Sequence, residues 1–328
     1  MSERYVRIHG PEPLLDREPT RREIEAQLGP QLKLLEDLAD YGVLQLKRCF
    51  VKSEREIEDV VVVLILFRQV LVALDSVSVL LRNGATYAAN LPLRSLFEAV
   101  WALEWMLHKE PGLAWKRFYV AFLRQNRQWS RRVISGTEEN RAMLNAVRVE
   151  YPGFGKDKYP IEEDAREAVA DIDRVLLTDE LADVDEEFTA VAERRGYEPQ
   201  WYQVRNPGDT KAIGSIRRLA RGLGHEVQYD YLYGPMSAAA HGTEFLKHVK
   251  LDVSGAVIEP VRSGEGFATT YSLTGTVTLR AFRMLLAKYR PAESRQLDQK
   301  YVRDWRDRLM KMPEIVVEAE MGSLDELG

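Results

Sequence analysis

An arginine and a glutamate stand four residues apart in a strongly apolar stretch, residues 85–110 of the chain. They are Arg94 and Glu98. Residues at this spacing share one face of a helix, so the two side chains can form an ion pair. A helix that is apolar on nearly all sides lies in a protein interior, where a charge needs a polar partner or a cavity. The sequence therefore predicts an interior helix whose Arg94–Glu98 pair faces a cavity or a further polar group.

A second row of polar side chains recurs every four residues later in the chain. It consists of Tyr229, Tyr233, Ser237 and His241. On one continuous helix this spacing brings hydroxyl and imidazole groups to one face. A helix that begins at Pro235 would instead separate the tyrosines from Ser237 and His241. A histidine in such a row is suited to acid–base chemistry, although buried polar groups are usually satisfied by their neighbours.

These two rows supply the candidate catalytic residues Arg94, Glu98, Ser237 and His241. In this hypothesis Arg94 binds or stabilises a phosphate, His241 acts as acid or base, and Glu98 orients one of them. The sequence separates Arg94 from His241 by almost 150 residues. We nevertheless expect the two to approach each other, because each needs a polar partner.

A basic amphipathic helix is predicted after residue 113. Its polar face carries five arginines: Arg117, Arg124, Arg127, Arg131 and Arg132. A solvated face is the usual meaning of such a pattern, and a groove for phosphates is the alternative. Under that alternative Arg124 and Arg131 join Tyr229 and Tyr233 as candidate binding residues.

A metal site is a further hypothesis for the second row. His241, Glu244 and His248 fall on one helix face if Gly242 does not break the helix, and Glu98 could complete the ligand set. The Glu-x-x-His pairs of helical di-iron proteins are missing, however. We therefore predict no metal and no cofactor, with these four residues as the alternative set.

The composition limits the classes of protein to which this chain can belong. The chain has 328 residues, of which 45% are apolar and 30% charged, with a net charge of −5. This charge argues against broad electrostatic binding to nucleic acid but not against a local basic groove. The single cysteine, Cys49, excludes a disulfide framework within the chain, and the charged first thirty residues lack the apolar centre of a signal peptide. We expect a cytoplasmic protein.

One segment, residues 60–81, is as apolar and as long as a membrane span. Arg68 and Asp75 fall within it, and both are costly in the centre of a bilayer. We therefore predict a core helix and no contact with a membrane.

The expected fold is mostly α, a helical bundle core with a small β-hairpin near residues 247–261, where polar and apolar residues alternate. We expect an extended arm over residues 1–20, and a helical core over 21–250 that carries an acidic, solvent-facing helical arm at 161–196. Residues 251–328 should form the hairpin and C-terminal helices packed on the core.

Two breaks in the helical pattern bear on the candidate site. Gly42 interrupts the first predicted helix. Pro92 leaves two alternatives, a new helix capped by Asn90 or one longer helix that is kinked. In the first case Arg94 would lie near a helix N-terminus, where free N–H groups favour an anion.

The order of these motifs carries a family resemblance. LPLRSLFEAV is followed by Trp201, then by SIRRLARGLG and YDYLYGPMSAAAHGT. Over roughly residues 55–250 the chain resembles a prokaryotic helical family known as domain of unknown function 5677. The resemblance implies an all-α core and no particular activity. The matching positions are Arg94, Glu98, Tyr233, Ser237 and His241.

A looser similarity is to helical ribonucleases and toxins of the HEPN type, which use an arginine, four to six residues, and then a histidine. Arg218 and His225 have this spacing. Two glycines interrupt the segment, and Leu219 stands where a polar residue is usual.

Two classes of function follow. The first is an RNA- or nucleotide-directed enzyme, a metal-independent nuclease of a bacterial phage-defence or toxin system. The second is a non-catalytic sensor or scaffold whose Arg–Glu–His network fixes the helix packing. Established motifs such as a Walker loop, a Rossmann glycine pattern, His-Glu-x-x-His or Gly-x-Ser-x-Gly are absent. We favour the enzyme, with RNA or a nucleotide as partner; whether it forms a homo-oligomer or binds a partner protein stays open.

Overall fold

The chain is mostly helical and divides into two compact units. The computed structural model describes residues 8–9, 14–152, 162–204, 213–240, 248–252 and 255–311. Unit 1 comprises Met1–Glu104 and His225–Gly328, and unit 2 comprises Trp105–Gly224. The sequence-based division instead kept residues 105–224 within one helical core over 21–250.

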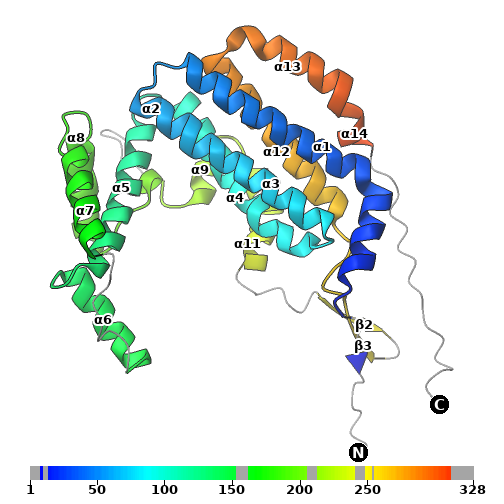
Figure 1. Cartoon of the computed structure of the whole chain (residues 1–328), viewed down its shortest axis with the longest axis horizontal. Helices are drawn as coiled ribbons and strands as arrows, with labels where there is room; N and C mark the ends of the chain where they lie inside the picture. Colours follow the sequence, from blue (N-terminus) through cyan, green and yellow to red (C-terminus); the bar gives the residue numbers. More distant parts are fainter. Residues whose placement is uncertain are drawn as a thin grey trace, which may run out of the picture. The chain divides into compact units, whose positions relative to one another are not determined.

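Four long helices form the bundle of unit 1 (Figure 1). They are α1 (Arg17–Lys52), α3 (Arg68–Arg82), α4 (Thr86–Glu104) and α12 (Phe267–Tyr289). The contacts run from α1 to α3, from α3 to α4, from α4 to α12 and from α12 back to α1, which closes the bundle. Their apolar faces therefore meet in a single core.

Aromatic rings fill this core where α1 and α12 meet. The ring of Phe282 lies 5.8 Å from that of Phe67 and 5.5 Å from that of Tyr41. Tyr41 also contacts Trp305 edge to face at 5.2 Å. Phe67, Phe282 and Trp305 are fully buried. Residues from the N-terminal and C-terminal parts of the sequence therefore pack in one core.

Helix α1 corrects two expectations about the N-terminal segment. It begins at Arg17, so the last part of the predicted arm is helical, with Pro19 in the first turn where a missing N–H does no harm. It also continues through Gly42. A methyl group at Gly42 would clash with Leu71 and lie 3.0 Å from the ring of Phe282. The glycine therefore serves close packing and is not a helix stop.

The apolar segment before α3 forms one helical run. α2 (Ile57–Asp59) leads into the π-helical η1 (Val60–Phe67) and then into α3. Over Ile57–Arg82 this run is long and apolar enough to cross a membrane, with a mean hydropathy of 2.3, and 56% of the most apolar part is buried inside the protein. Core helices meet the same criterion of length and composition, so it is weak support for a membrane span.

Helix α4 is continuous through Pro92. The alternative of a new helix capped by Asn90 is therefore wrong. Arg94 lies in the interior of the helix, so free N–H groups of a helix N-terminus do not contribute to its site.

The expectation that α4 is apolar on nearly all sides is also wrong. Leu91 is 49% exposed, Ser95 is exposed, and Arg94 and Glu98 are half-buried. These positions follow helical spacing along one side, while the opposite side packs in the bundle. The buried positions include Leu93, Leu96, Phe97, Val100 and Trp101.

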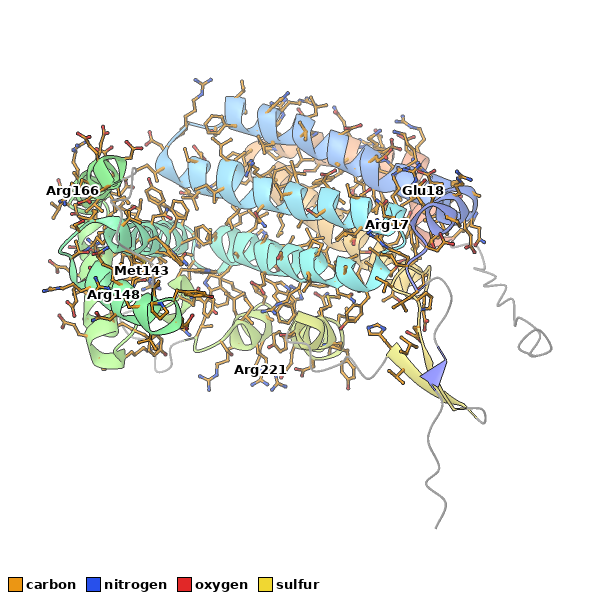
Figure 2. The ribbon with its side chains drawn as sticks, turned by 60° about the horizontal axis from the view of Figure 1, so that its bottom comes forward. Arg17, Glu18, Met143, Arg148, Arg166 and Arg221 are labelled. Atoms are coloured by element: carbon orange, nitrogen blue, oxygen red, sulfur yellow. The ribbon has the colours of Figure 1, made fainter. Side chains whose placement is uncertain are left out.

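Three residues of the second polar row, Tyr229, Tyr233 and Ser237, lie on a helical run that packs against α4; the ribbon of this run is seen beside α4 in Figure 2. The run consists of α10 (Glu226–Gln228), the π-helical η4 (Tyr229–Tyr233) and α11 (Gly234–Ala240). The N–H of Gly234 donates to the carbonyl of Tyr229, five residues back. This wider turn precedes Pro235, whose ring would crowd the carbonyl of a regular α-turn. The run is not broken at Pro235, so both tyrosines share it with Ser237.

Short strands lie near the predicted hairpin. β2 (Val249–Asp252) pairs antiparallel with β3 (Gly255–Ile258), and β1 (Ile8–His9) pairs parallel with β3. Residues 253–254, which would form the turn between β2 and β3, lie outside the described residues. The hairpin as a whole therefore stays a prediction.

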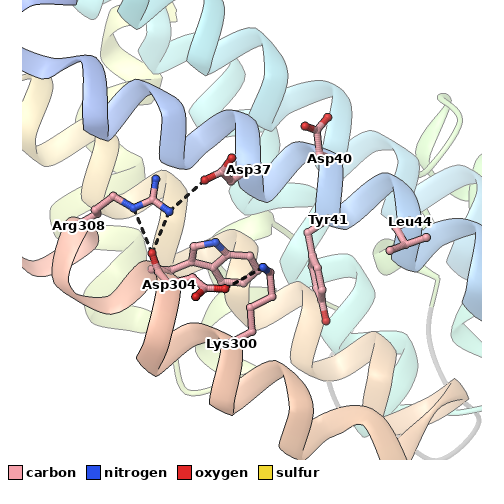
Figure 3. A pocket seen from close by; sticks show the side chains of 8 residues that line it. Asp37, Asp40, Tyr41, Leu44, Lys300, Asp304 and Arg308 are labelled. Carbon is pink, nitrogen blue, oxygen red and sulfur yellow. Dashed lines mark hydrogen bonds and ion pairs between the residues drawn. The ribbon is translucent and has the colours of Figure 1, made fainter.

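The C-terminal helical run is attached to α1 by charged side chains (Figure 3). It contains α13 (Ser294–Lys300), η7 (Tyr301–Trp305) and α14 (Arg306–Met310). Arg308 donates to Asp37 of α1 at 3.0 Å, and within the C-terminal run Lys300 pairs with Asp304 at 3.0 Å. The pocket there, of about 570 Å³, is lined by these paired groups, so we do not place the functional site in it.

Unit 2 is helical in its described part. It contains η2 (Trp105–Lys109), α5 (Ala114–Val133), α6 (Glu138–Glu150), α7 (Glu162–Leu176), α8 (Ala182–Arg195), η3 (Trp201–Gln203) and α9 (Ile216–Gly222). Helices α6, α7 and α8 all pack on α5. The basic helix of the sequence is therefore the centre of this unit.

Candidate functional site

Arg94, Glu98 and Tyr233 form one hydrogen-bonded network in unit 1. The Nε–H of Arg94 donates to Glu98 Oε1 at 3.1 Å and to Tyr233 Oη at 2.9 Å. The Tyr233 hydroxyl in turn donates to Glu98 Oε1. One turn of α4 supplies the ion pair through its i, i+4 spacing, and η4 brings the phenol from 135 residues further along the chain. The network therefore depends on the packing of two segments.

Aromatic rings hold Tyr233 in place. Its side chain is 1% exposed, and its ring stacks on Tyr229 with centroids 4.9 Å apart. Trp101 lies 5.4 Å from the same ring. The guanidinium carbon of Arg94 lies over the ring at 5.1 Å, a cation–π distance. This cluster fixes the position at which the hydroxyl meets Arg94 and Glu98.

The surroundings keep the Tyr233 phenol protonated and the Arg94 guanidinium charged. Burial, followed by the hydrogen bond to Glu98, raises the pKa of Tyr233, so its phenol remains a donor. Burial lowers the pKa of Arg94, but the hydrogen bond and charge of Tyr233 and Glu98 outweigh it and raise the pKa overall. Arg94 is therefore a permanent cation at this site.

The outer part of Arg94 remains available. Its side chain is 27% exposed and that of Glu98 is 42% exposed. Within the described part of the chain, the two terminal guanidinium nitrogens have no hydrogen-bond partner, since only Nε donates. A guanidinium anchored through Nε presents these terminal N–H groups as a rigid fork suited to phosphate or carboxylate.

The other candidate residues are placed only in part. Ser237 is half-buried in α11, one turn after Tyr233. His241 and Glu244 lie outside the described residues, so the approach of His241 to Arg94 stays a prediction. Among the residues that are described, no group of three or more His, Cys, Asp or Glu side chains could hold a metal. His248 of the alternative metal set pairs with Glu259 at 3.2 Å.

One known protein family matches the larger part of the chain. The family of unknown function DUF5677 matches residues 60–256, more than half of the chain. The chain belongs to this family. The match confirms the family resemblance of the sequence, and a HEPN similarity is not shown. No curated protein and no solved structure matches.

The DUF5677 match also includes the basic helix α5. In this helix Arg124 is buried and ion-paired, although the sequence suggested a phosphate-binding role for it. Its side chain is only 7% exposed. It forms a two-pronged ion pair with Glu198 at 2.8 and 2.9 Å and donates to Asp185 at 2.7 Å. All three of its nitrogens are engaged, so a phosphate would have to displace a carboxylate. This speaks against the binding role predicted for Arg124.

The predicted solvated face of α5 is likewise wrong at Arg117, whose side chain is 3% exposed. Arg117 pairs with Glu187 at 3.3 Å, and Arg127 pairs with Asp173 at 2.9 Å. The acidic arm therefore meets the basic helix instead of facing solvent alone. Arg131, the other candidate binding residue of α5, is 41% exposed and pairs with Glu139 at 3.0 Å.

Sequence reasoning missed a second polar cluster, which consists of His225, Glu104 and Arg280. His225 Nε2 lies 3.1 Å from Glu104 Oε2, and Arg280 contacts both side chains. Burial and then the charge of Arg280 lower the pKa of His225, partly opposed by Glu104. His225 and Glu104 are separated by 121 residues, and no local pattern links them.

Proposed function

We propose that the Arg94 network binds phosphate groups and that the protein is an RNA- or nucleotide-directed enzyme. In this proposal it is a metal-independent nuclease of a bacterial phage-defence or toxin system. Arg94 contacts the phosphate, Glu98 and Tyr233 position Arg94, and His241 is the acid or base. Tyr229 and Ser237 line the approach to this site.

One observation carries the proposal. The Nε of Arg94 is anchored by two acceptors, whereas its terminal nitrogens are partly exposed and have no partner among the described residues. Arg124, by contrast, engages all three of its guanidinium nitrogens with Glu198 and Asp185. The contrast between the two arginines supports an external anion at Arg94.

Cleavage of RNA at such a site needs no group beyond an arginine and a proton carrier. His241 takes the proton of a ribose 2′-hydroxyl, and the 2′-oxygen attacks the adjacent phosphorus. The bond from phosphorus to the 5′-oxygen breaks, the leaving oxygen takes a proton from water, and the protonated His241 returns a proton to the resulting hydroxide. Arg94 stabilises the charge that develops on the phosphate oxygens. The products are a 2′,3′-cyclic phosphate and a 5′-hydroxyl.

The second candidate, a non-catalytic sensor or scaffold, also has an observation in its favour. Glu98, Arg94 and Tyr233 already bind one another, as a network that fixes helix packing would. Under this alternative, replacing Arg94 mainly lowers stability. The loss stays below the roughly 3–5 kcal/mol of a fully buried pair, since Arg94 is 27% exposed.

The test uses purified full-length protein and a fluorescent single-stranded RNA. Arg94→Gln should bind this RNA about tenfold or more weakly, because a charge-assisted hydrogen bond contributes about 1.5–3 kcal/mol. His241→Ala should keep RNA binding and lose about two to four orders of magnitude of cleavage rate. Toxicity in cells and protection against phage are measured in parallel with both variants.

The matched control is Arg68→Gln, which removes an exposed arginine of α3. It should bind and cleave RNA as the unaltered protein does. Equal RNA binding by Arg94→Gln and the unaltered protein would contradict the phosphate site. A His241→Ala protein that melts and cleaves like the unaltered chain would overturn the catalytic role.

We also propose that the protein is cytoplasmic and does not insert into a membrane. The support is the partial burial of Ile57–Arg82 within unit 1 and the presence of Arg68 and Asp75 in it. The chain should stay in the supernatant when a detergent-free lysate is centrifuged at high speed. Recovery from the pellet by detergent alone would contradict this.

A further inference from the structure

A cavity of about 760 Å³ in unit 1 is formed by the same two segments as the Arg94 network, α4 and the η4–α11 run. The end of β3, the residues after it and the start of α12 complete its wall. Its volume falls within the range of small-molecule sites. Much of the wall is apolar, including Leu14, Leu232, Met236, Ile258, Val261 and Leu273. The cavity therefore suits the ring system of a small molecule.

The cavity wall and the Arg94 network are neighbours on both segments. On α4, Asn90 lines the cavity and Arg94 follows it by four residues. Residues at this spacing lie on one face of a helix, about one turn apart. On the facing run, Leu232 lines the cavity, and the next residue, Tyr233, accepts a hydrogen bond from Arg94. A ligand longer than one helical turn can therefore contact both the cavity and Arg94.

The side-chain amide of Asn90 is a polar group that such a ligand can reach. Asn90 is half-buried, and within the described part of the chain its amide has no hydrogen-bond partner. The amide atoms are not among the fully buried atoms that lack a partner, so they keep accessible surface. An amide both donates and accepts, which matches the edge of a nucleobase, as in the pairing of asparagine with adenine.

The charges of the wall determine which end of the ligand enters. Glu259 and Glu265 are negative, and the described wall contains no lysine or arginine. His248 pairs with Glu259 at 3.2 Å, whereas Glu265 is exposed. A phosphate is therefore repelled from the cavity and attracted to the terminal nitrogens of Arg94. Carboxylates accept hydrogen bonds, so a neutral ring with an amino group suits the cavity itself.

We propose that the cavity holds the base of a nucleoside phosphate whose phosphate lies on Arg94. The base pairs with the amide of Asn90 and stacks on the ring of Tyr231, which lines the cavity and is 76% exposed. This inference rests on the phosphate site proposed above and adds its substrate class. The nucleoside phosphate is either a free nucleotide or one nucleotide of an RNA chain.

The test compares adenosine 5′-monophosphate with ribose 5-phosphate by titration of the full-length protein. Both probes carry the same phosphate and sugar, and only the first has a base. The unaltered protein should bind adenosine 5′-monophosphate about tenfold or more tightly, the gain expected from stacking one base on an aromatic side chain. Asn90→Ala should reduce this preference about threefold or more, because it removes a hydrogen bond to the base. It should bind ribose 5-phosphate as before.

A larger side chain in the cavity gives a second, independent variant. Leu273→Trp should weaken adenosine 5′-monophosphate and leave ribose 5-phosphate unchanged, because only the base needs the space. Thermal melts without probe show that both variants are folded. Ser95→Ala is the matched control, since Ser95 follows Arg94 on α4 and is not part of the cavity wall. It should bind both probes as the unaltered protein does.

A fluorescent single-stranded RNA distinguishes the two sources of the nucleotide. If RNA supplies the base, Asn90→Ala weakens RNA binding, and adenosine 5′-monophosphate displaces the RNA. If a free nucleotide is the ligand, Asn90→Ala weakens adenosine 5′-monophosphate only. Both results support a base in the cavity.

Failure of the cavity site and failure of the phosphate site give different results. Arg94→Gln should weaken both probes about tenfold, and unchanged binding of both would contradict the phosphate site and with it this inference. Equal affinity of the unaltered protein for the two probes, with both weakened in Arg94→Gln, would overturn the cavity site alone. A full preference for adenosine 5′-monophosphate in both Asn90→Ala and Leu273→Trp would place the base elsewhere and overturn it as well.

Discussion

The hydroxyl of Tyr233 joins the two halves of the Arg94 network, because it donates to Glu98 and accepts from Arg94. Its ring is fixed by Tyr229 and Trp101, so the hydroxyl has little freedom to move away. In this position it directs the guanidinium through Nε and leaves the terminal nitrogens open. Tyr233 is therefore a positioning residue for Arg94.

Replacing Tyr233 by Phe keeps the ring and removes only this hydroxyl. We expect the free energy of unfolding to fall by about 1–2 kcal/mol, since a hydrogen bond to a charged group is lost while Glu98 can still reach water. Urea denaturation measures the change. Tyr229→Phe is the control, because no partner of its hydroxyl is seen among the described residues, and it should change stability less. Equal losses in both variants would contradict the role of Tyr233.

Among the helices, α1 and α4 each contain a residue that usually breaks a helix, Gly42 and Pro92, and neither residue ends its helix. A glycine weakens a helix by about 1 kcal/mol relative to alanine, which packing of the bundle can offset. At Gly42 the reason is direct, since the backbone approaches Leu71 and Phe282 too closely for a side chain.

Gly42→Ala should therefore destabilise the protein despite the better helix propensity of alanine. Overpacking against Leu71 and Phe282 costs about 1–3 kcal/mol. In a Leu71→Ala background the same change should cost less, because part of the obstructing side chain is gone. Thermal or urea unfolding of the four proteins gives the coupling. A stabilising Gly42→Ala, or an equal cost in both backgrounds, would contradict the packing argument.

At the scale of the whole molecule, unit 2 is an insertion between two parts of unit 1. The chain leaves unit 1 after Glu104 and returns at His225. These two residues contact each other, and Arg280 of α12 contacts both. The cluster therefore joins the two ends of the insertion within unit 1.

The cluster should make stability depend on pH. The pKa of His225 is lowered by burial and by Arg280, so the folded chain favours the neutral ring. The unfolded chain binds the proton more readily, with the usual pKa of about 6.5, so this contribution is present above that pH and is lost below it. Acidification from about pH 7.5 to 5.5 should lower the melting temperature more in the unaltered protein than in His225→Gln. Equal shifts would contradict the assignment.

Features that depend on neighbours along the chain could be predicted from the amino-acid sequence. The Arg94–Glu98 pair follows from the four-residue spacing on a helix. The four-residue repeat that begins at Tyr229 likewise singled out Tyr233 as a candidate. Apolar periodicity was sufficient to predict a mostly helical fold. The motif order was sufficient to predict the DUF5677 family, which its match over residues 60–256 confirms.

Which charged side chains pair with each other depends on how distant segments pack, and the sequence did not predict it. The sequence predicted Arg124 to be a solvated or phosphate-binding side chain. Its partners Asp185 and Glu198 follow 61 and 74 residues later, so no local pattern shows the pairing. The partly exposed side of α4 could not be predicted for a related reason. The apolar composition of α4 does not indicate which of its sides the neighbouring helices cover. Burial and ion pairing arise when distant segments pack, and a linear pattern records only what lies within a few turns of each residue.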